Sequence, residues 1–358
     1  MFLVSLLLPL ARGSIESFIE KQRALGGQIP NLVVASEDLN HVLGEEVELA
    51  QLLVATWGAC IFAHSGLVIK YQVQDDSNEE EELHPLSRDY FFAELLAPLG
   101  IAPNVFYLSP EEMLPEEPTW KTQFGMTEAE RASLVAHGRG VRFMVEERMV
   151  RSIFDIQLSY EGGRVPPSDA ILLGIHMIQI LRKSHDQARV VHGDIHGGNV
   201  MVRVNGLLGL VDFGRARFLS PDEPTLVEEA FSLNDPLLSP WEIAGFPPMP
   251  RDDVYRAIML TASMLQGASF DEWFAFNNHD TMLCYDQKIH SNLFLFQFNP
   301  FESLLFLSPQ QRSHIHKCLE LVMRLTQGLV NASQRPPYEL ILAKLYSVYK
   351  IISNSSGY

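Results

Sequence analysis

The sequence predicts an α+β protein in which a small β-rich lobe precedes a larger helical lobe. Three short runs with the composition of β-strands lie between Val47 and Val73, whereas apolar residues recur at the helical period beyond residue 150. The chain has 358 residues, more than one ordinary domain of about 100 to 200 residues, which suits two lobes.

In the first lobe, strands are predicted wherever apolar and β-branched runs are bounded by turns. Turns at 56–58 and 65–66 divide the region 47–73 into three antiparallel strands. Further along the chain, a helix is expected over 89–99, a strand over 105–108, a short helix over 127–136 and a last strand over 141–149.

The second lobe is predicted to be mainly helical. Ser168 and Asp169 are predicted to cap a helix whose apolar residues recur at the helical period. Small strands are expected over 190–192, 199–204 and 208–213, and helices over 253–267, 270–277, 309–328 and 338–350. The sequence Ser308-Pro309-Gln310-Gln311 predicts a capping box for the third of these helices.

The composition is that of a soluble globular protein, with 47% hydrophobic and 20% charged residues. Acidic residues outnumber basic ones 44 to 27, for a formal net charge of −17. Nucleic acid is not an expected partner, because its binding depends mainly on Lys and Arg that neutralise phosphates. The three cysteines lie far apart and fit neither a disulfide framework nor a zinc spacing.

Residues 1–13 are predicted to be a signal peptide, which implies the secretory pathway. Residues 2–11 form an apolar stretch, and small residues precede a cleavage point before Ser14. No basic residues precede the stretch, so a short apolar element of a cytoplasmic protein is the alternative. The segment 14–45 is predicted to be a helical extension, whose amphipathic helix over 14–25 packs on the body or touches a membrane surface.

The motif that carries chemistry is HGDIHGGN at 192–199, followed by LVDFG at 210–214. Asn199 stands five residues after Asp194, and Asp212 stands thirteen residues further on. A β-hairpin between the two loops would bring these three side chains to one rim. There a carboxylate can orient an attacking hydroxyl, while an amide and a second carboxylate can hold magnesium against nucleotide phosphates.

These paired motifs resemble the catalytic loop and the metal-binding motif of the protein-kinase-like superfamily. The resemblance implies a bilobal fold, with an N-lobe over 46–148 and a C-lobe over 149–352. It also implies ATP and Mg²⁺ as cofactors, Asp194 as the catalytic base, and Asn199 and Asp212 as metal ligands.

Lys70 is the candidate for the lysine that grips the nucleotide phosphates in this superfamily. It lies in an apolar strand and is the only lysine between Lys21 and Lys121. Glu94 resembles the helix glutamate that pairs with this lysine, since it stands eight residues before the entry to the next strand. Asp89 is the competing choice.

Further resemblances extend over most of residues 46–350. Val145 and Glu146 look like the gatekeeper and hinge, whose backbone would bind adenine. His192 and Phe213 look like internal spine residues rather than catalysts.

Three places in the C-terminal half resemble protein kinases. Asp253 looks like the helix aspartate that anchors the catalytic loop, and Ser239 to Glu242 resemble the end of an activation segment. Arg335 looks like the arginine that pairs with that glutamate, and the contact is a sharp test because 93 residues separate the two. These correspondences favour a protein substrate, and parts of this half are similar to the casein kinase 1 branch.

The glycine-rich loop is the main departure from the pattern. No G-x-G-x-x-G occurs between residues 46 and 66, so bound phosphates would lack that lid. In this the chain resembles the secreted kinases of apicomplexan parasites that have no glycine loop. Because every residue with a direct electrostatic role is kept, we expect an active serine/threonine protein kinase, with a pseudokinase scaffold as the alternative.

Two substitutions bear on regulation and substrate. Gly193 replaces the arginine that usually precedes the catalytic aspartate, so a phosphorylated activation segment would find no partner there and constitutive activity is expected. His196 stands where protein kinases usually have a lysine, and here HGDIHGGN is similar to the aminoglycoside and choline kinases. A small-molecule phosphotransferase is therefore the second alternative.

Overall fold

A computed structural model gives the fold of the chain in two compact units, Met1–Met149 and Val150–Tyr358. The residues it describes are 51–55, 59–64, 67–73, 85–108, 112–113, 140–219, 239, 242, 248–267, 302–327 and 335–355. The predicted lobe boundary falls one residue before the boundary between the units. The predictions of a signal peptide, of a helical extension over 14–45 and of helices over 127–136 and 270–277 lie outside the described residues.

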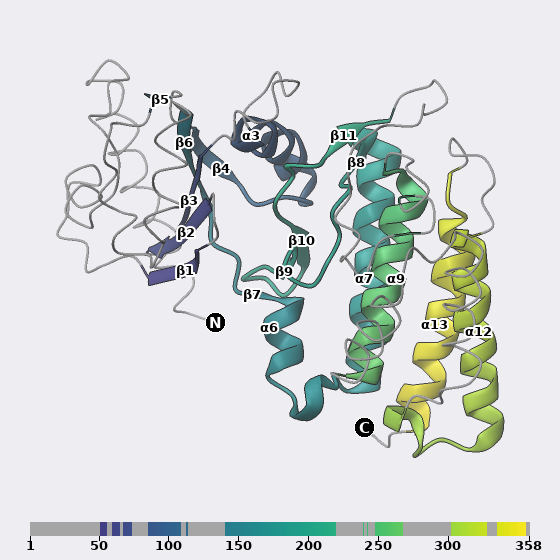
Figure 1. Cartoon of the computed structure of the whole chain (residues 1–358). Coiled ribbons are helices and arrows are strands. Elements are labelled where there is room, and N and C mark those ends of the chain that lie inside the picture. The colour runs from purple at the N-terminus through teal and green to yellow at the C-terminus, as the bar shows by residue number, and fades with distance from the viewer. Residues whose placement is uncertain are drawn as a thin grey trace, which may run out of the picture. The chain divides into compact units, whose positions relative to one another are not determined.

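The first unit is built on an antiparallel sheet. Its strands are β1 (Gln51–Ala55), β2 (Ala59–His64), β3 (Leu67–Val73), β4 (Val105–Leu108), β5 (Glu112–Met113) and β6 (Gly140–Glu147). They pair in the order β1-β2-β3-β6-β4, and β5 also pairs with β6 (Figure 1). The strands predicted within 51–73 and over 105–108 are confirmed, and the last strand ends two residues earlier than predicted.

Helix α3 (Pro85–Leu96) contacts strands β4 and β6, and a 3₁₀ turn, η1 (Ala97–Leu99), follows it. The buried apolar residues of α3 are Leu86, Phe92, Ala93 and Leu96, and Ile101 and Ala102 are buried just beyond η1. The helix begins four residues before its predicted start at 89, so Asp89 lies within the helix rather than at its N-terminus.

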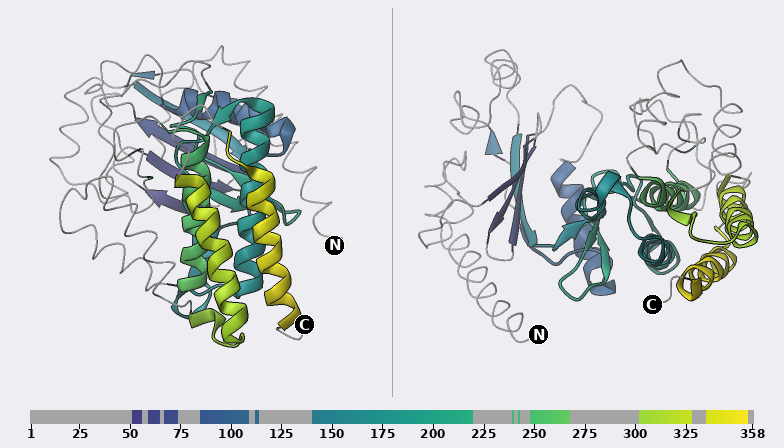
Figure 2. Two further views of the ribbon diagram at one scale, coloured as in Figure 1. Left: turned by 90° about the vertical axis from the view of Figure 1, so that its right-hand side faces the viewer. Right: turned by 90° about the horizontal axis from the view of Figure 1, so that it is seen from below.

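In the described part of the second unit, four long helices pack together: α7 (Pro167–Lys183), α9 (Pro250–Gln266), α12 (Pro309–Gln327) and α13 (Tyr338–Ser355). Helix α7 packs on α9 and α13, and α12 packs on the same two, so the four lie side by side (Figure 2). Helix α9 is buried from Pro250 to Leu265. Burial on every side is typical of a central helix, and it places the charged residues of α9 in the interior.

Gly174 sets the close approach of α7 to α9. A Cβ atom at this position would lie 2.6 Å from Oγ1 of Thr261 on α9. The Thr261 hydroxyl is itself held, since it donates a hydrogen bond to the carbonyl of Ala257 at 2.8 Å. No larger residue therefore fits at this crossing without moving the helices apart.

The helix starts of the second unit agree only partly with the sequence. The N-cap of α7 is Pro166, which makes no side-chain cap, so the prediction that Ser168 and Asp169 cap this helix is wrong. Asp169 lies in the first turn instead, where a carboxylate favours the helix dipole. The capping box of α12 is confirmed, because the Ser308 and Gln311 backbone N–H groups each donate to the other side chain, at 3.0 and 3.3 Å.

The other elements that the structure describes in the second unit are short strands and short helices. They are β7 (Arg151–Ser152), α6 (Ile153–Leu158), η2 (Glu161–Gly163), η3 (Ser184–Ala188), β8 (Val190–Val191), β9 (Val200–Val202), β10 (Leu208–Leu210), β11 (Arg217–Phe218) and η4 (Glu302–Leu304). Strands β9 and β10 form an antiparallel hairpin that also pairs with β7, whereas β11 pairs with β8. Among the helices that the structure describes, none is both long and apolar enough to cross a membrane.

Candidate active site

Lys70 is a buried ammonium group held between two carboxylates in the first unit. Its Nζ atom lies 3.1 Å from Oδ2 of Asp89 on α3 and 3.0 Å from Oε1 of Glu146 on β6. The three side chains are at most 10% exposed. Charges buried this deeply are stable only when they are paired, so Lys70 has one defined position in the unit.

The prediction that Glu94 pairs with Lys70 is wrong, and the competing choice, Asp89, takes its place. Five residues turn an α-helix by about 500°, so the two acids point in directions about 140° apart. Asp89 is 3% exposed and faces the sheet, whereas Glu94 is exposed. Glu94 contacts Tyr90 instead, where burial and then the charge of Glu94 raise the pKa of the tyrosine.

Val145 and Glu146 lie inside strand β6, which continues to Glu147 and has β3 on one side and β4 on the other. Glu146 is opposite Val68, two residues from Lys70, so Glu146 and Lys70 share a face of the sheet. This contact of the Glu146 side chain was missed in the sequence. Adenine binding by the backbone of Val145 and Glu146 stays a prediction.

In the second unit, the β9–β10 hairpin brings the catalytic-loop motif and the DFG motif together, as predicted. The Asn199 amide donates to the backbone carbonyl of Asp194 at 3.0 Å and to its Oδ2 at 3.4 Å. The Val211 N–H, next to Asp212, donates to the Asn199 carbonyl at 3.0 Å. The two loops that carry Asp194, Asn199 and Asp212 therefore lie together in this unit, while the convergence of the three side chains on one cleft stays a prediction.

His192 links the two loops from the interior. Its Nδ1 atom accepts the Asp194 N–H at 3.2 Å and its Nε2 atom lies 3.1 Å from the Val211 carbonyl, which requires the tautomer protonated at Nε2. Its ring also packs on Phe213, with centroids 4.8 Å apart. Both rings are buried, in agreement with the internal role predicted for them.

Asp212 has an exposed side chain on a strained backbone. Its φ of 63° lies in the left-handed region, which costs a non-glycine residue on the order of 1 kcal/mol and is found preferentially at functional sites. The Gly214 N–H donates to Oδ1 of Asp212 at 3.4 Å. The carboxylate of Asp212 and the amide oxygen of Asn199 are ligand types that suit Mg²⁺, which usually takes one or two protein ligands plus substrate phosphates.

Asp253 anchors the catalytic loop, as predicted. Its carboxylate accepts the backbone N–H groups of His192 at 2.8 Å and Gly193 at 2.9 Å, and it lies 2.9 Å from Nε2 of His185. Burial alone would raise the pKa of Asp253, but the hydrogen bond and charge of His185 together with His192 lower it below its ordinary value. The loop is thus tied to helix α9 by a buried carboxylate.

A second layer holds this anchor in place. Nδ1 of His185 is hydrogen-bonded to the hydroxyl of Tyr338, the first residue of α13. Burial and then the charge of Asp253 raise the pKa of Tyr338 well above its ordinary value, so the phenol stays protonated and donates to His185. Helix α13 therefore supports the catalytic loop through two buried side chains.

Gly193 has a physical reason to be glycine. Its φ is +77°, and a Cβ atom there would lie 2.9 Å from the carbonyl oxygen of Arg215. An arginine at this position would be strained and would displace the backbone after the DFG motif.

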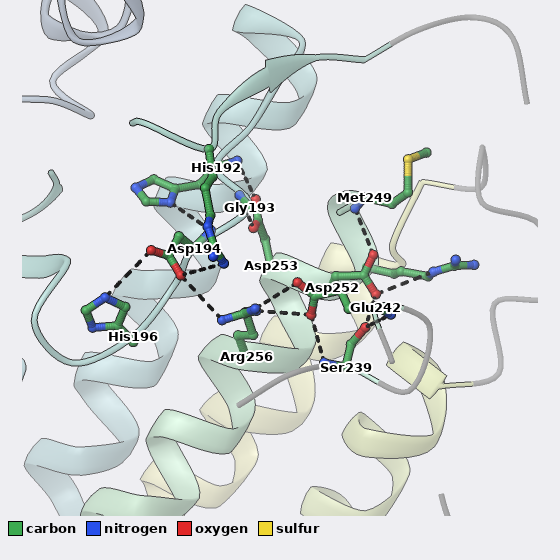
Figure 3. A network of polar contacts seen from close by, with 12 residues as sticks. His192, Gly193, Asp194, His196, Ser239, Glu242, Met249, Asp252, Asp253 and Arg256 are labelled. Carbon is green, nitrogen blue, oxygen red and sulfur yellow. Dashed lines mark hydrogen bonds and ion pairs between the residues drawn. The ribbon is translucent and has the colours of Figure 1, made fainter. Parts of the chain in front are cut away.

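Asp194 is surrounded by groups that carry or can carry positive charge. Its Oδ1 atom lies 3.7 Å from Nη1 of Arg256 and 3.8 Å from Nη1 of Arg215, and its Oδ2 atom lies 3.9 Å from Nε2 of His196. The side chains of Arg215 and His196 are 47% and 42% exposed, whereas that of Arg256 is fully buried. Figure 3 shows Arg256 between Asp194 and the pair formed by Glu242 and Ser239.

The predicted contact between Glu242 and Arg335 is wrong. Glu242 receives two hydrogen bonds from Arg256, at 3.1 Å from Nε and 2.8 Å from Nη2. Arg335 binds Asp186 and Glu339 at the surface, with its side chain 45% exposed. A guanidinium group can donate two parallel hydrogen bonds to one carboxylate. Arg256 on the buried helix α9 donates both to Glu242.

The roles of Arg256, His185 and Tyr338 were not predicted from the sequence. One signal for Arg256 was available, because it stands three residues after Asp253, on the same side of a helix that carries no other charged residue beyond it. His185 and Tyr338 carried no such signal, since they come from segments 153 residues apart.

Asp252 gives the buried network a pH dependence. Burial and then the charge of Glu242 raise the pKa of Asp252 to about 7. Ser239 Oγ donates to its Oδ1 atom at 2.5 Å and the Met249 N–H to its Oδ2 atom at 2.7 Å, while Nε of Arg251 lies 3.7 Å away. The folded protein therefore keeps a proton that the unfolded chain releases once the pH rises above the ordinary value of 3.8.

The unfolding free energy of the wild type is expected to fall relative to that of Asp252→Asn as the pH rises from 3.8 to about 7, and then to level off. The sign follows because the folded state binds the extra proton throughout that window. Urea denaturation at a series of pH values measures the difference, and Asp169→Asn at an exposed site serves as the control. A constant difference across the window would contradict the raised pKa.

The α+β fold and the anchored catalytic loop support a kinase-like phosphotransferase. The APH model, described as a phosphotransferase enzyme family, matches residues 169–221, which include both motifs. The match therefore supports phosphotransfer as the class of reaction.

Curated relatives point to the same superfamily. A probable serine/threonine-protein kinase of Corynebacterium efficiens is 31% identical over 132 residues, which cover 36% of this chain and 20% of that protein. One of Streptomyces coelicolor is 31% identical over 110 residues, 30% of this chain and 16% of that protein. One of Corynebacterium glutamicum is 26% identical over 132 residues, 36% of this chain and 20% of that protein.

These matches support a place in the protein-kinase-like superfamily. The matched part spans a fifth or less of the length of each relative. The finer resemblances, to casein kinase 1 and to secreted kinases without a glycine loop, receive no support from these matches and stay predictions.

Proposed function

We propose that the protein transfers the γ-phosphate of ATP, in the presence of magnesium, to serine or threonine of a protein substrate. The observation that carries this proposal is the catalytic loop, in which Asp194 and Asn199 are hydrogen-bonded and Asp253 holds the backbone of residues 192 and 193. The names of the relatives and the anchoring aspartate favour a protein substrate.

In this proposal each residue has a separate task. Asp194 accepts the proton of the substrate hydroxyl and orients its oxygen, while the buried ammonium of Lys70 binds nucleotide phosphates. Asn199 and Asp212 would hold magnesium, which when bound neutralises charge on the β- and γ-phosphates. Among the described residues no group of three or more His, Cys, Asp or Glu could hold a metal ion, so we expect magnesium to bind together with the nucleotide.

Small-molecule phosphotransfer is the second candidate. The APH family model covers the catalytic loop itself. The contact of Glu242 with Arg335, which joins two of the three places that favoured a protein substrate, is not formed. The anchoring role of Asp253 still favours a protein substrate.

A transfer assay with radiolabelled ATP separates the candidates. The full chain with magnesium is expected to label generic protein acceptors on serine or threonine, and not choline, sugars or aminoglycosides. Label confined to a small molecule would reverse the ranking. A protein that binds ATP but labels nothing would be the pseudokinase scaffold.

ATP with magnesium is expected to raise the melting temperature of the wild type, because a ligand that binds only the folded state stabilises it. The shift should vanish with EDTA and in Asp212→Ala, whereas the control Asp169→Ala should keep it.

The same measurement checks the pairing of Lys70 with Asp89. Asp89→Asn should weaken nucleotide binding, and Glu94→Gln on the same helix should not. No shift in the wild type at millimolar ATP would contradict the nucleotide site.

A further inference from the structure

Arg256 is a fully buried guanidinium that contacts two carboxylates from different segments (Figure 3). Two of its nitrogen atoms, Nε and Nη2, donate to the two oxygens of Glu242 at 3.1 and 2.8 Å. Its third nitrogen, Nη1, lies 3.7 Å from Oδ1 of Asp194, the proposed catalytic base. One rigid side chain thus faces Asp194 with its orientation fixed by Glu242.

The geometry leaves Arg256 little freedom to move. A bidentate arginine–carboxylate pair is directional as well as strong, and here both side chains have no exposed surface. The other two positive groups near Asp194, Arg215 and His196, are nearly half exposed and are more easily displaced by water. Arg256 is therefore the cation with a fixed position beside the carboxylate.

Glu242 is itself held by the segment that resembles the end of an activation segment. The Ser239 N–H donates to Oε2 of Glu242 at 2.7 Å, and the Glu242 N–H donates to Oγ of Ser239 at 3.1 Å. The Ser239 hydroxyl in turn donates to Asp252 on α9. A continuous buried chain of contacts thus leads from Ser239 through Glu242 and Arg256 to Asp194.

We propose that Arg256 is a positioning residue for phosphotransfer: it holds the carboxylate of Asp194 in place and couples it to Glu242 and Ser239. The inference rests on the proposed function, because it assigns Arg256 a part in the same reaction.

The test must separate positioning from plain stability. Arg256→Gln leaves Glu242 buried without its cation, which is expected to lower the melting temperature sharply. The double variant Arg256→Gln/Glu242→Gln replaces the ion pair by two amides that can bond to each other, and it should recover most of that loss. If Arg256 positions Asp194, the double variant should still lose about tenfold to a hundredfold in kcat, with KM for ATP unchanged.

Arg256→Lys provides a second arm that keeps the charge. A lysine is a point charge and cannot serve both carboxylates with a fork, so kcat should fall between those of the wild type and the double variant. The matched control is Arg324→Gln/Glu320→Gln, an arginine–glutamate pair on α12 whose arginine is 53% exposed. This control should change neither kcat nor the melting temperature.

The outcomes distinguish the inference from the proposed function. A folded double variant or Arg256→Lys variant with wild-type kcat overturns the inference alone and makes Arg256 a structural residue. A wild-type protein that transfers no phosphate overturns the proposed function, and the inference with it.

Discussion

Asp194→Asn is expected to lower kcat for phosphotransfer by about a thousandfold, within the range of about 10² to 10⁴ typical of general acid–base catalysis. The amide has nearly the size of the carboxylate and can still accept the hydrogen bond from Asn199, but it cannot take a proton from the substrate hydroxyl. The KM for ATP should change little, because the proposed nucleotide contacts come from Lys70, Asn199 and Asp212.

Steady-state kinetics with a labelled acceptor measures this effect. Asp169→Asn, an exposed aspartate in the first turn of α7, is the matched control and should keep wild-type activity. If Asp194→Asn retained a tenth or more of the wild-type kcat, Asp194 would not be the base.

Asp253→Ala is expected to lower the unfolding free energy by about 3 to 5 kcal/mol, the usual cost of removing one partner from a buried charged contact. The change leaves the buried N–H groups of His192 and Gly193 and the ring of His185 without their acceptor. Urea denaturation of the full chain measures the loss. Because the catalytic loop depends on these bonds, transfer activity should fall as well.

Asp186→Ala is the contrasting control for Asp253. Asp186 also binds an arginine, Arg335, but its side chain is 30% exposed, and surface pairs contribute only about 0 to 1 kcal/mol.

The stabilisation by Asp253 depends on pH with a definite sign. Because the pKa of Asp253 is lowered, its contribution to the unfolding free energy is present above the ordinary value of 3.8 and is lost as the pH falls through the lower folded value. Equal losses in the two variants at pH 7 would contradict the anchoring role.

Helix α9 contributes three buried charged residues near its N-terminal end, and each of them makes a different contact. Asp252 binds Ser239, Asp253 holds the catalytic loop, and Arg256 joins Glu242 to Asp194. Apolar residues of the same helix pack on α7 and α12. The packing of the helical unit on α9 therefore fixes the positions of the residues that hold the catalytic loop.

Features that depend on neighbouring residues were predictable from the sequence alone. The strands within 51–73 and over 105–108 and the hairpin between the two motifs follow from periodicity, turns and short spacing. Asp253 also took the place that the resemblance to protein kinases implied, because it holds the backbone of the catalytic loop.

The pairing of charges over long distances was decided only by the tertiary structure. Helix α3 starts four residues earlier than predicted, and the angle of about 140° between Asp89 and Glu94 makes Asp89 the partner of Lys70 on this helix. Glu242 binds Arg256 rather than Arg335 because a buried carboxylate must find its cation in the interior, and packing placed α9 there. Sequence spacing identifies the charged residues, but burial determines which of them must meet.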